Sequence, residues 1–137
     1  MKKIIYACFL LTILLILNGC SNTKNNYKPL VDVNRGIEKI KLELSLPSSK
    51  PVIIEDKEKI QEFANYINYL DLKKVESKEG YLDGTYIINV FFNDNTSKEF
   101  LIFGGKYFVF ERYKYEITAE EAQKFLDFYY SMLKSQS

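Results

Sequence analysis

The sequence predicts an α+β domain: an antiparallel sheet of about four to five strands with two helices packed on one face. Two observations support this. Short segments with apolar residues at every second position indicate strands, and two longer segments with apolar residues three or four apart indicate helices. In addition, turn-forming residues rather than helices separate most of the strand segments, which favours hairpins and therefore antiparallel pairing.

The first predicted strand is Ile37 to Leu46, where polar residues separate the apolar ones, as in a half-buried strand. A segment with two prolines, Pro47 to Pro51, ends it. Val52 to Ile54 then predicts a short second strand.

A helix is predicted from Lys57 to about Leu70, with Asp56 as its N-cap. Its apolar stripe consists of Ile60, Phe63, Ala64, Ile67 and Leu70. The polar segment from Lys73 to Gly84 is predicted to be a loop.

The second half predicts a meander that begins with a central strand, Tyr86 to Phe92. Asn93 to Thr96 predicts a turn, because Asn and Asp tolerate a left-handed backbone. The same four residues faintly resemble a calcium loop, but they lack its glycine and its bidentate glutamate. Phe100 to Phe103 is the next predicted strand.

Gly104 and Gly105 predict a tight hairpin that leads into a strand from Tyr107 to Phe110. Residues 113–117 alternate again, either as a last strand or as an extension past a bulge near residues 111–112. Thr118 and Glu121 have the spacing of a capping box and predict a helix from Ala119 to about Lys134. Its apolar face consists of Ala122, Phe125, Leu126, Tyr129, Met132 and Leu133.

The first twenty residues have the layout of a secretory signal. Lys2 and Lys3 precede an apolar run from Ile4 to Leu17, and Gly19 stands directly before Cys20. As a helix the run is about 21 Å long, too short for a hydrocarbon core of about 30 Å. The sequence therefore predicts a cleaved signal rather than a membrane-spanning helix.

Leu17, Asn18, Gly19 and Cys20 together resemble the lipobox of bacterial lipoproteins. The resemblance implies that Leu17 to Gly19 are recognised by a dedicated signal peptidase and that the Cys20 sulfur receives a diacylglycerol. It also implies acylation of the new N-terminus and a place on the extracytoplasmic face of a cell membrane. A plain secretory signal cleaved elsewhere is the alternative.

These features divide the chain into a cleaved signal (residues 1–19), a lipidated cysteine with a flexible polar tether (20–36) and a single domain (37–137). Leu30, Val31 and Val33 could instead add a short edge strand.

Composition narrows the chemistry of the mature chain. It has no histidine, and its one cysteine, Cys20, is expected to carry lipid, so the common nucleophilic triads and a structural zinc site are excluded. No cofactor or metal site is expected. Cleavage removes Lys2 and Lys3 from the 19 basic residues and none of the 18 acidic ones, so the net charge becomes −1. This balance predicts neither nucleic-acid binding nor electrostatic attachment to lipid.

The best candidates for an interaction face are Tyr107, Tyr113 and Tyr115, which lie with Phe103, Phe108 and Phe110 in adjacent predicted strands. Two helices can cover only one face of the sheet, so the other face would carry several aromatic residues. Alternatively, these residues stabilise one another as cross-strand pairs.

The expected function is that of a membrane-anchored lipoprotein with a non-enzymatic domain that binds a protein or peptide, as immunity and phage-exclusion lipoproteins do. One alternative is a peptide pheromone processed from Ile13 to Gly19, a segment similar to those that precede a lipobox cysteine in some bacteria. A small envelope enzyme with two buried carboxylates is a further alternative.

Overall fold

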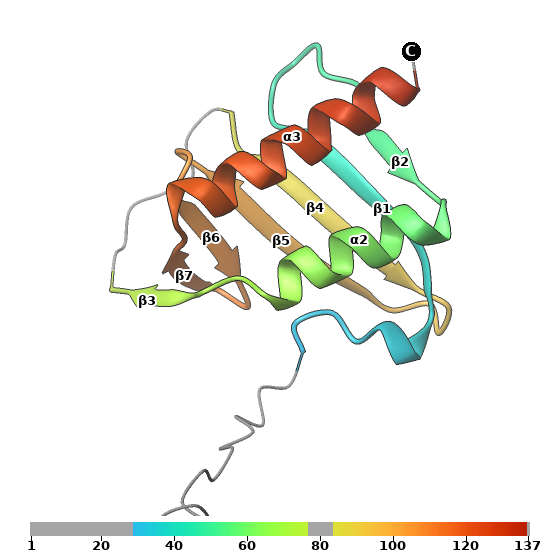
Figure 1. Ribbon diagram of the computed structural model, residues 1–137, viewed down its shortest axis with the longest axis horizontal. Helices are drawn as coiled ribbons and strands as arrows, with labels where there is room; N and C mark the ends of the chain where they lie inside the picture. Colours follow the sequence, from blue (N-terminus) through green and yellow to red (C-terminus); the bar gives the residue numbers. More distant parts are fainter. Residues whose placement is uncertain (1–28, 77–83, 137) are drawn as a thin grey trace, which may run out of the picture.

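A computed structural model of the protein describes residues 29–76 and 84–136. In this part of the chain the fold has two layers, a seven-stranded antiparallel sheet and two helices that lie across one of its faces (Figure 1). The predicted α+β class is confirmed. The predicted count of four to five strands is wrong.

The sheet has the strand order β2-β1-β4-β5-β6-β7-β3. The strands are β1 (Ile37–Leu44), β2 (Val52–Ile54), β3 (Lys73–Val75), β4 (Tyr86–Phe92), β5 (Ser97–Phe103), β6 (Tyr107–Phe110) and β7 (Tyr113–Glu116). The helices are α2 (Lys57–Asn68) and α3 (Ala119–Ser135), and a short 3-10 helix, η1 (Val33–Arg35), precedes β1.

Two elements account for the wrong strand count. β3 lies inside the segment predicted as a loop and pairs antiparallel with β7. β7 is a separate strand that pairs with β6 from Tyr107↔Glu116 to Phe110↔Tyr113, and not an extension of β6. β3 is only three residues long and two of them are lysines, so it has no apolar alternation by which the sequence could reveal it.

One hydrophobic core lies between the sheet and the helices. The strands contribute buried residues at alternate positions, and each helix contributes its apolar stripe. Fully buried members include Ile40, Leu42, Ile67, Ile88, Val90, Phe63, Phe92, Phe100, Phe108 and Phe125. Leu133, which the sequence places on the apolar face of the last helix, is 37% exposed.

The folded domain begins earlier in the chain than the predicted end of the tether at Gly36. Val31 is 0% exposed and joins the core. Asn68 Oδ1 accepts from the Val31 N–H at 2.8 Å, and Asn68 Nδ2 donates to the Val31 carbonyl at 2.8 Å. The Asn68 side-chain amide thus satisfies both backbone groups of Val31, as a neighbouring strand would. Residues 31–36 therefore belong to the folded domain and not to a tether.

η1 is tied to the turn between β4 and β5. The Arg35 guanidinium binds the Asp94 carboxylate, with Nε to Oδ2 at 3.2 Å. It also donates to Thr96 Oγ1 and lies 4.3 Å from the centre of the Phe92 ring. The Gly36 carbonyl accepts from the Asn93 N–H at 3.1 Å. This cluster fixes where the chain joins the sheet.

The hairpin turns follow the predicted chemistry at two places. Asn95 has φ 61°, and Gly104 and Gly105 have φ 60° and 65°, all in the left-handed region. The turn between β6 and β7 is different, because Glu111 and Arg112 have φ 50° and 69° without being glycine or asparagine. Two positive φ values in a two-residue connection are typical of a type I′ hairpin turn.

Both helix starts agree with the sequence. Asp56 caps α2 by accepting from the Lys59 N–H at 2.9 Å, and Thr118 and Glu121 form the predicted capping box of α3. Burial acts to raise the pKa of Glu121, but hydrogen bonds from the Asp71 and Thr118 N–H groups and from the Thr118 hydroxyl lower it overall. Asp56 and Glu121 are therefore capping groups.

A side chain from the end of α3 covers the free edge of β2. Gln136 Nε2 donates to the Ile53 carbonyl, and Gln136 Oε1 accepts from the Ile53 N–H at 3.4 Å. These are the backbone groups of β2 that point away from β1, so the amide takes the place of a further strand.

Candidate functional site

The predicted lipidation site and its recognition residues, Leu17, Asn18, Gly19 and Cys20, lie outside the described residues. Within residues 29–76 and 84–136, no helix is both long and apolar enough to cross a bilayer.

The three predicted interface tyrosines do not share one face of the sheet. Tyr107 pairs with Glu116, whereas Tyr115 pairs with Phe108 and Tyr113 with Phe110. Because side chains alternate along a strand, Tyr113 and Tyr115 lie on the helix-covered side and Tyr107 on the opposite side. Tyr115 packs against the core, and Tyr113 remains 49% exposed near the edge of the sheet.

The sheet face that carries Tyr107, called the outer face below, is opposite the two helices. A cross-strand row of Ile87, Leu101, Val109 and Lys114 runs over β4, β5, β6 and β7. Of the six aromatic residues expected in this region of the sheet, only Phe103 and Tyr107 are on this face. The outer face therefore carries fewer aromatic residues than predicted.

Lysines cover the aromatic rings of the outer face. Lys114 Nζ is 3.9 Å from the centre of the Tyr107 ring and 5.4 Å from that of Phe103. Lys106 Nζ is 4.9 Å from the Tyr107 ring, and Lys39 Nζ is 5.5 Å from the Phe91 ring. These cation–π contacts stabilise the rings in place and give them charged neighbours. The aromatic residues are thus largely used within the sheet.

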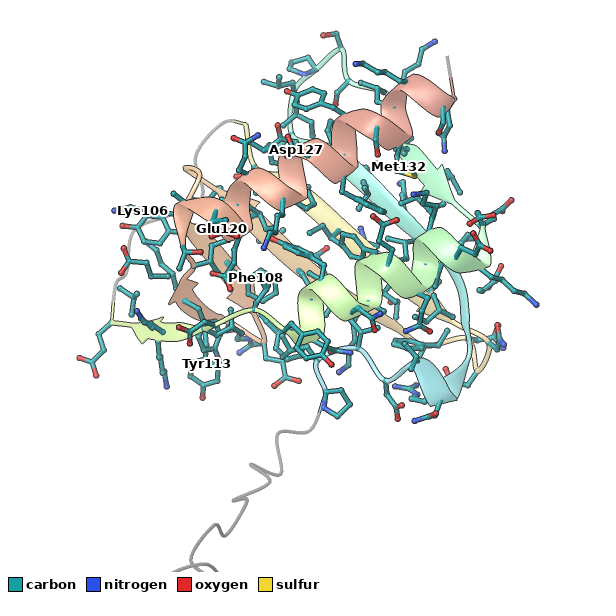
Figure 2. All side chains as sticks on the ribbon, in the orientation of Figure 1. Lys106, Phe108, Tyr113, Glu120, Asp127 and Met132 are labelled. Atoms are coloured by element: carbon teal, nitrogen blue, oxygen red, sulfur yellow. The ribbon has the colours of Figure 1, made fainter. Side chains whose placement is uncertain are left out.

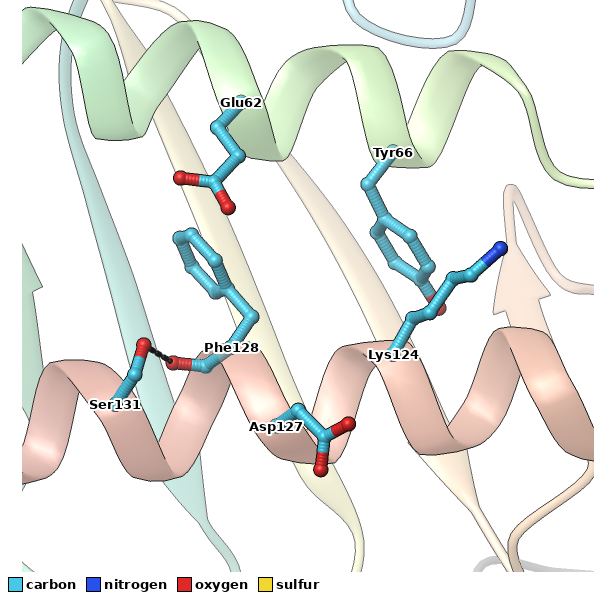
Figure 3. Close-up of a pocket in the computed structure, with 6 residues that line it drawn as sticks. All are labelled: Glu62, Tyr66, Lys124, Asp127, Phe128 and Ser131. Carbon is cyan, nitrogen blue, oxygen red and sulfur yellow. Dashed lines mark hydrogen bonds between the residues drawn. The ribbon is translucent and has the colours of Figure 1, made fainter.

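An apolar groove with a volume of about 380 Å³ lies between α2 and α3 (Figure 3). Tyr66 and Phe128 point into it from the two helices, and Glu62, Lys124, Asp127 and Ser131 complete its lining. The Tyr66 hydroxyl donates to the Glu121 carbonyl at 2.9 Å, and burial raises the pKa of that phenol.

The charged groups at the rim of this groove are bound on their own helices. Glu62 pairs with Lys59 at 2.7 Å, Lys124 with Glu120 at 2.9 Å, and Asp127 accepts from Gln123 at 2.8 Å. The groove therefore offers apolar contact rather than an acid–base pair. Among the described residues there is also no group of three or more His, Cys, Asp or Glu side chains that could hold a metal ion.

The helix patterns contain a partial signal for this groove. Tyr66 lies three residues after Phe63, and Phe128 lies three residues after Phe125, so each widens the apolar stripe of its helix. Which way the two widened stripes face depends on how the helices cross the sheet. The sequence alone does not contain that geometry.

Comparison with known proteins gives no relationship: no family model, no curated protein and no solved structure matches the chain.

Proposed function

We propose that the protein is a bacterial lipoprotein, held on the extracytoplasmic face of a cell membrane by acyl chains on Cys20. The observation that carries the proposal is the sequence of a positive start, a short apolar run and Leu17-Asn18-Gly19-Cys20. Two or more acyl chains anchor stably, at about 0.8 kcal/mol per buried CH₂. The near-neutral mature chain has no charge excess that could replace them.

The folded domain acts by binding a protein or peptide rather than by catalysis. Histidine is absent from the whole chain, and no cysteine follows Cys20. This removes the histidine base and the cysteine nucleophile on which many hydrolytic sites depend. The candidate carboxylates in the described domain serve as helix caps or as partners in surface ion pairs. An immunity or exclusion role is consistent with such a domain.

The test is processing and membrane attachment of the full chain. In the parent chain, globomycin, which blocks the lipoprotein signal peptidase, should cause the larger precursor to accumulate. Cys20→Ala should not incorporate labelled palmitate, and its mature form should no longer be found in the membrane. A Cys8→Ala variant is the matched control and should be processed normally. Cys20→Ala that still labels with palmitate would falsify the proposal.

A further inference from the structure

The described chain begins at one end of the domain, and that end is the one nearest to Cys20 along the chain. The Leu30 carbonyl accepts from Lys98 Nζ at 2.6 Å, and the two Asn68 hydrogen bonds hold Val31. Lys98 Nζ also lies 5.1 Å from the centre of the Phe110 ring. The chain therefore joins the domain beside the C-terminus of α2 and beside the turn between β6 and β7. This region is called the attachment end below.

Two tyrosines are exposed at the attachment end. Tyr69 directly follows Asn68 and is 85% exposed. Tyr113 pairs with Phe110, is 49% exposed, and has Lys74 Nζ 4.0 Å from its ring centre. Figure 2 shows Tyr113 at the lower edge of the molecule, the same edge at which the described chain begins. Tyrosine is enriched where membrane proteins meet the membrane–water interface, because its ring is apolar and its hydroxyl is polar.

The length of chain before this end restricts how the domain can face a bilayer. Pro29 lies nine residues after Cys20, and nine residues span at most about 30 Å when fully extended. A compact domain of about 100 residues has a radius of gyration of about 13 Å and is therefore roughly as wide as that full span. Turning the opposite end toward the bilayer would require an almost fully extended connection, which costs conformational entropy.

We propose that the attachment end rests in the headgroup region of the bilayer, with the Tyr69 and Tyr113 rings as its contacts. The inference rests on the lipid anchor proposed above. Charges of both signs occur at this end, among them Asp94, Glu111 and Arg112, so the contact comes from the tyrosine rings and not from net charge. The groove between α2 and α3 then remains open to a partner.

The test uses tryptophan as a depth probe, since the chain contains none of its own. The lipidated full chain, as Tyr113→Trp or Tyr69→Trp, is reconstituted in vesicles of phosphatidylethanolamine and phosphatidylglycerol. The vesicles contain lipids spin-labelled either at the headgroup or deep in the acyl chain.

Tyr130→Trp is the matched control, because Tyr130 is 50% exposed. Tyr130 hydrogen-bonds with Tyr86, whose pKa is raised to about 12 by burial and by that bond. Tyr86 stands at the far end of β4, about 20 Å from Phe92 at roughly 3.3 Å per residue.

Headgroup-labelled lipid should quench the tryptophan at position 69 or 113 at least about twofold more strongly than the one at position 130, and more strongly than the deep label does. Equal quenching at positions 113 and 130 in chains that float with the vesicles overturns the inference and leaves the anchor intact. In that case the exposed tyrosines of the attachment end would be free to contact a protein partner instead of the bilayer. Chains that do not float with the vesicles overturn the anchor, and the inference with it.

Discussion

At the scale of single residues, Asp94 couples the stability of the domain to pH. Hydrogen bonds from the Thr96 hydroxyl, from Arg35 and from the Thr96 N–H lower the pKa of Asp94 from 3.8 to about 2. Because the folded pKa lies below the unfolded one, ionised Asp94 stabilises the fold above about pH 4. This contribution is lost as the pH falls from about 4 to about 2.

The corresponding prediction compares the parent chain with Asp94→Asn. Free energies of unfolding, measured by urea titration, should fall more steeply between pH 4 and pH 2 in the parent chain than in the variant. The amide keeps an acceptor for Thr96 but has no charge to lose. Parallel pH profiles would show that the charge of Asp94 contributes nothing to stability, as is found for many exposed charges.

A second residue, Asn68, is predicted to stabilise the N-terminal boundary of the domain. Asn68→Ala leaves the Val31 N–H and carbonyl without their partners in a buried position. Unsatisfied buried groups cost about 1–3 kcal/mol, so a loss of about 2 kcal/mol in the free energy of unfolding is expected.

The matched control is Asn65→Ala on the same helix, since the Asn65 side chain accepts from Gln61 on the exposed surface. Both substitutions change helix propensity equally, so their difference reports the contact with Val31. The control should change stability by less than about 0.5 kcal/mol. If urea unfolding shows equal losses for the two variants, Asn68 does not hold the N-terminal segment.

At the scale of secondary-structure elements, the turn between β6 and β7 is strained. Glu111 and Arg112 both have positive φ, and a left-handed residue that is not glycine costs about 1 kcal/mol or more. Replacing the pair by Asn and Gly, the preferred type I′ residues, should raise the free energy of unfolding by about 1–2 kcal/mol.

Gly105→Ala supplies the opposite control, measured by the same urea titration. Gly105 has φ +65°, and a Cβ added there would contact nothing within 4 Å. Only backbone strain is introduced, and a loss of about 1 kcal/mol is expected. If the Asn-Gly variant is not more stable than the parent chain, the turn residues are not under strain in solution.

The elements also show which features the sequence could predict. β4 has the predicted bounds, Tyr86 to Phe92, because a continuous apolar strand between turn signals is unambiguous. β3 was missed because its pairing with β7 depends on a neighbour and not on its own pattern. The placement of Tyr107 opposite Tyr113 and Tyr115 follows from a two-residue turn. The sequence left that turn undecided between a bulge and a new strand.

At the scale of the whole molecule, the proposed anchor and the folded domain depend on different kinds of information. The proposed anchor depends on residues 17–20, whose local amino-acid sequence is enough to indicate it. The domain depends on long-range packing, such as Val31 against Asn68, which 37 residues of separation hide from any local pattern. The sequence predicts a tether as far as Gly36 because the segment is polar and rich in asparagine. That composition does not reveal that Val31 is buried.

The two edge strands of the sheet, β2 and β3, are protected in different ways. This difference determines at which edge a second copy of the chain could pair. At β2 the Gln136 amide occupies the outward backbone groups of Ile53. At β3 the outer strand carries Lys73 and Lys74, whose like charges oppose the approach of a second copy. Any chain shortened before residue 136 would lose the amide that covers β2. Fibre growth or crystal packing by strand addition would then start from that edge.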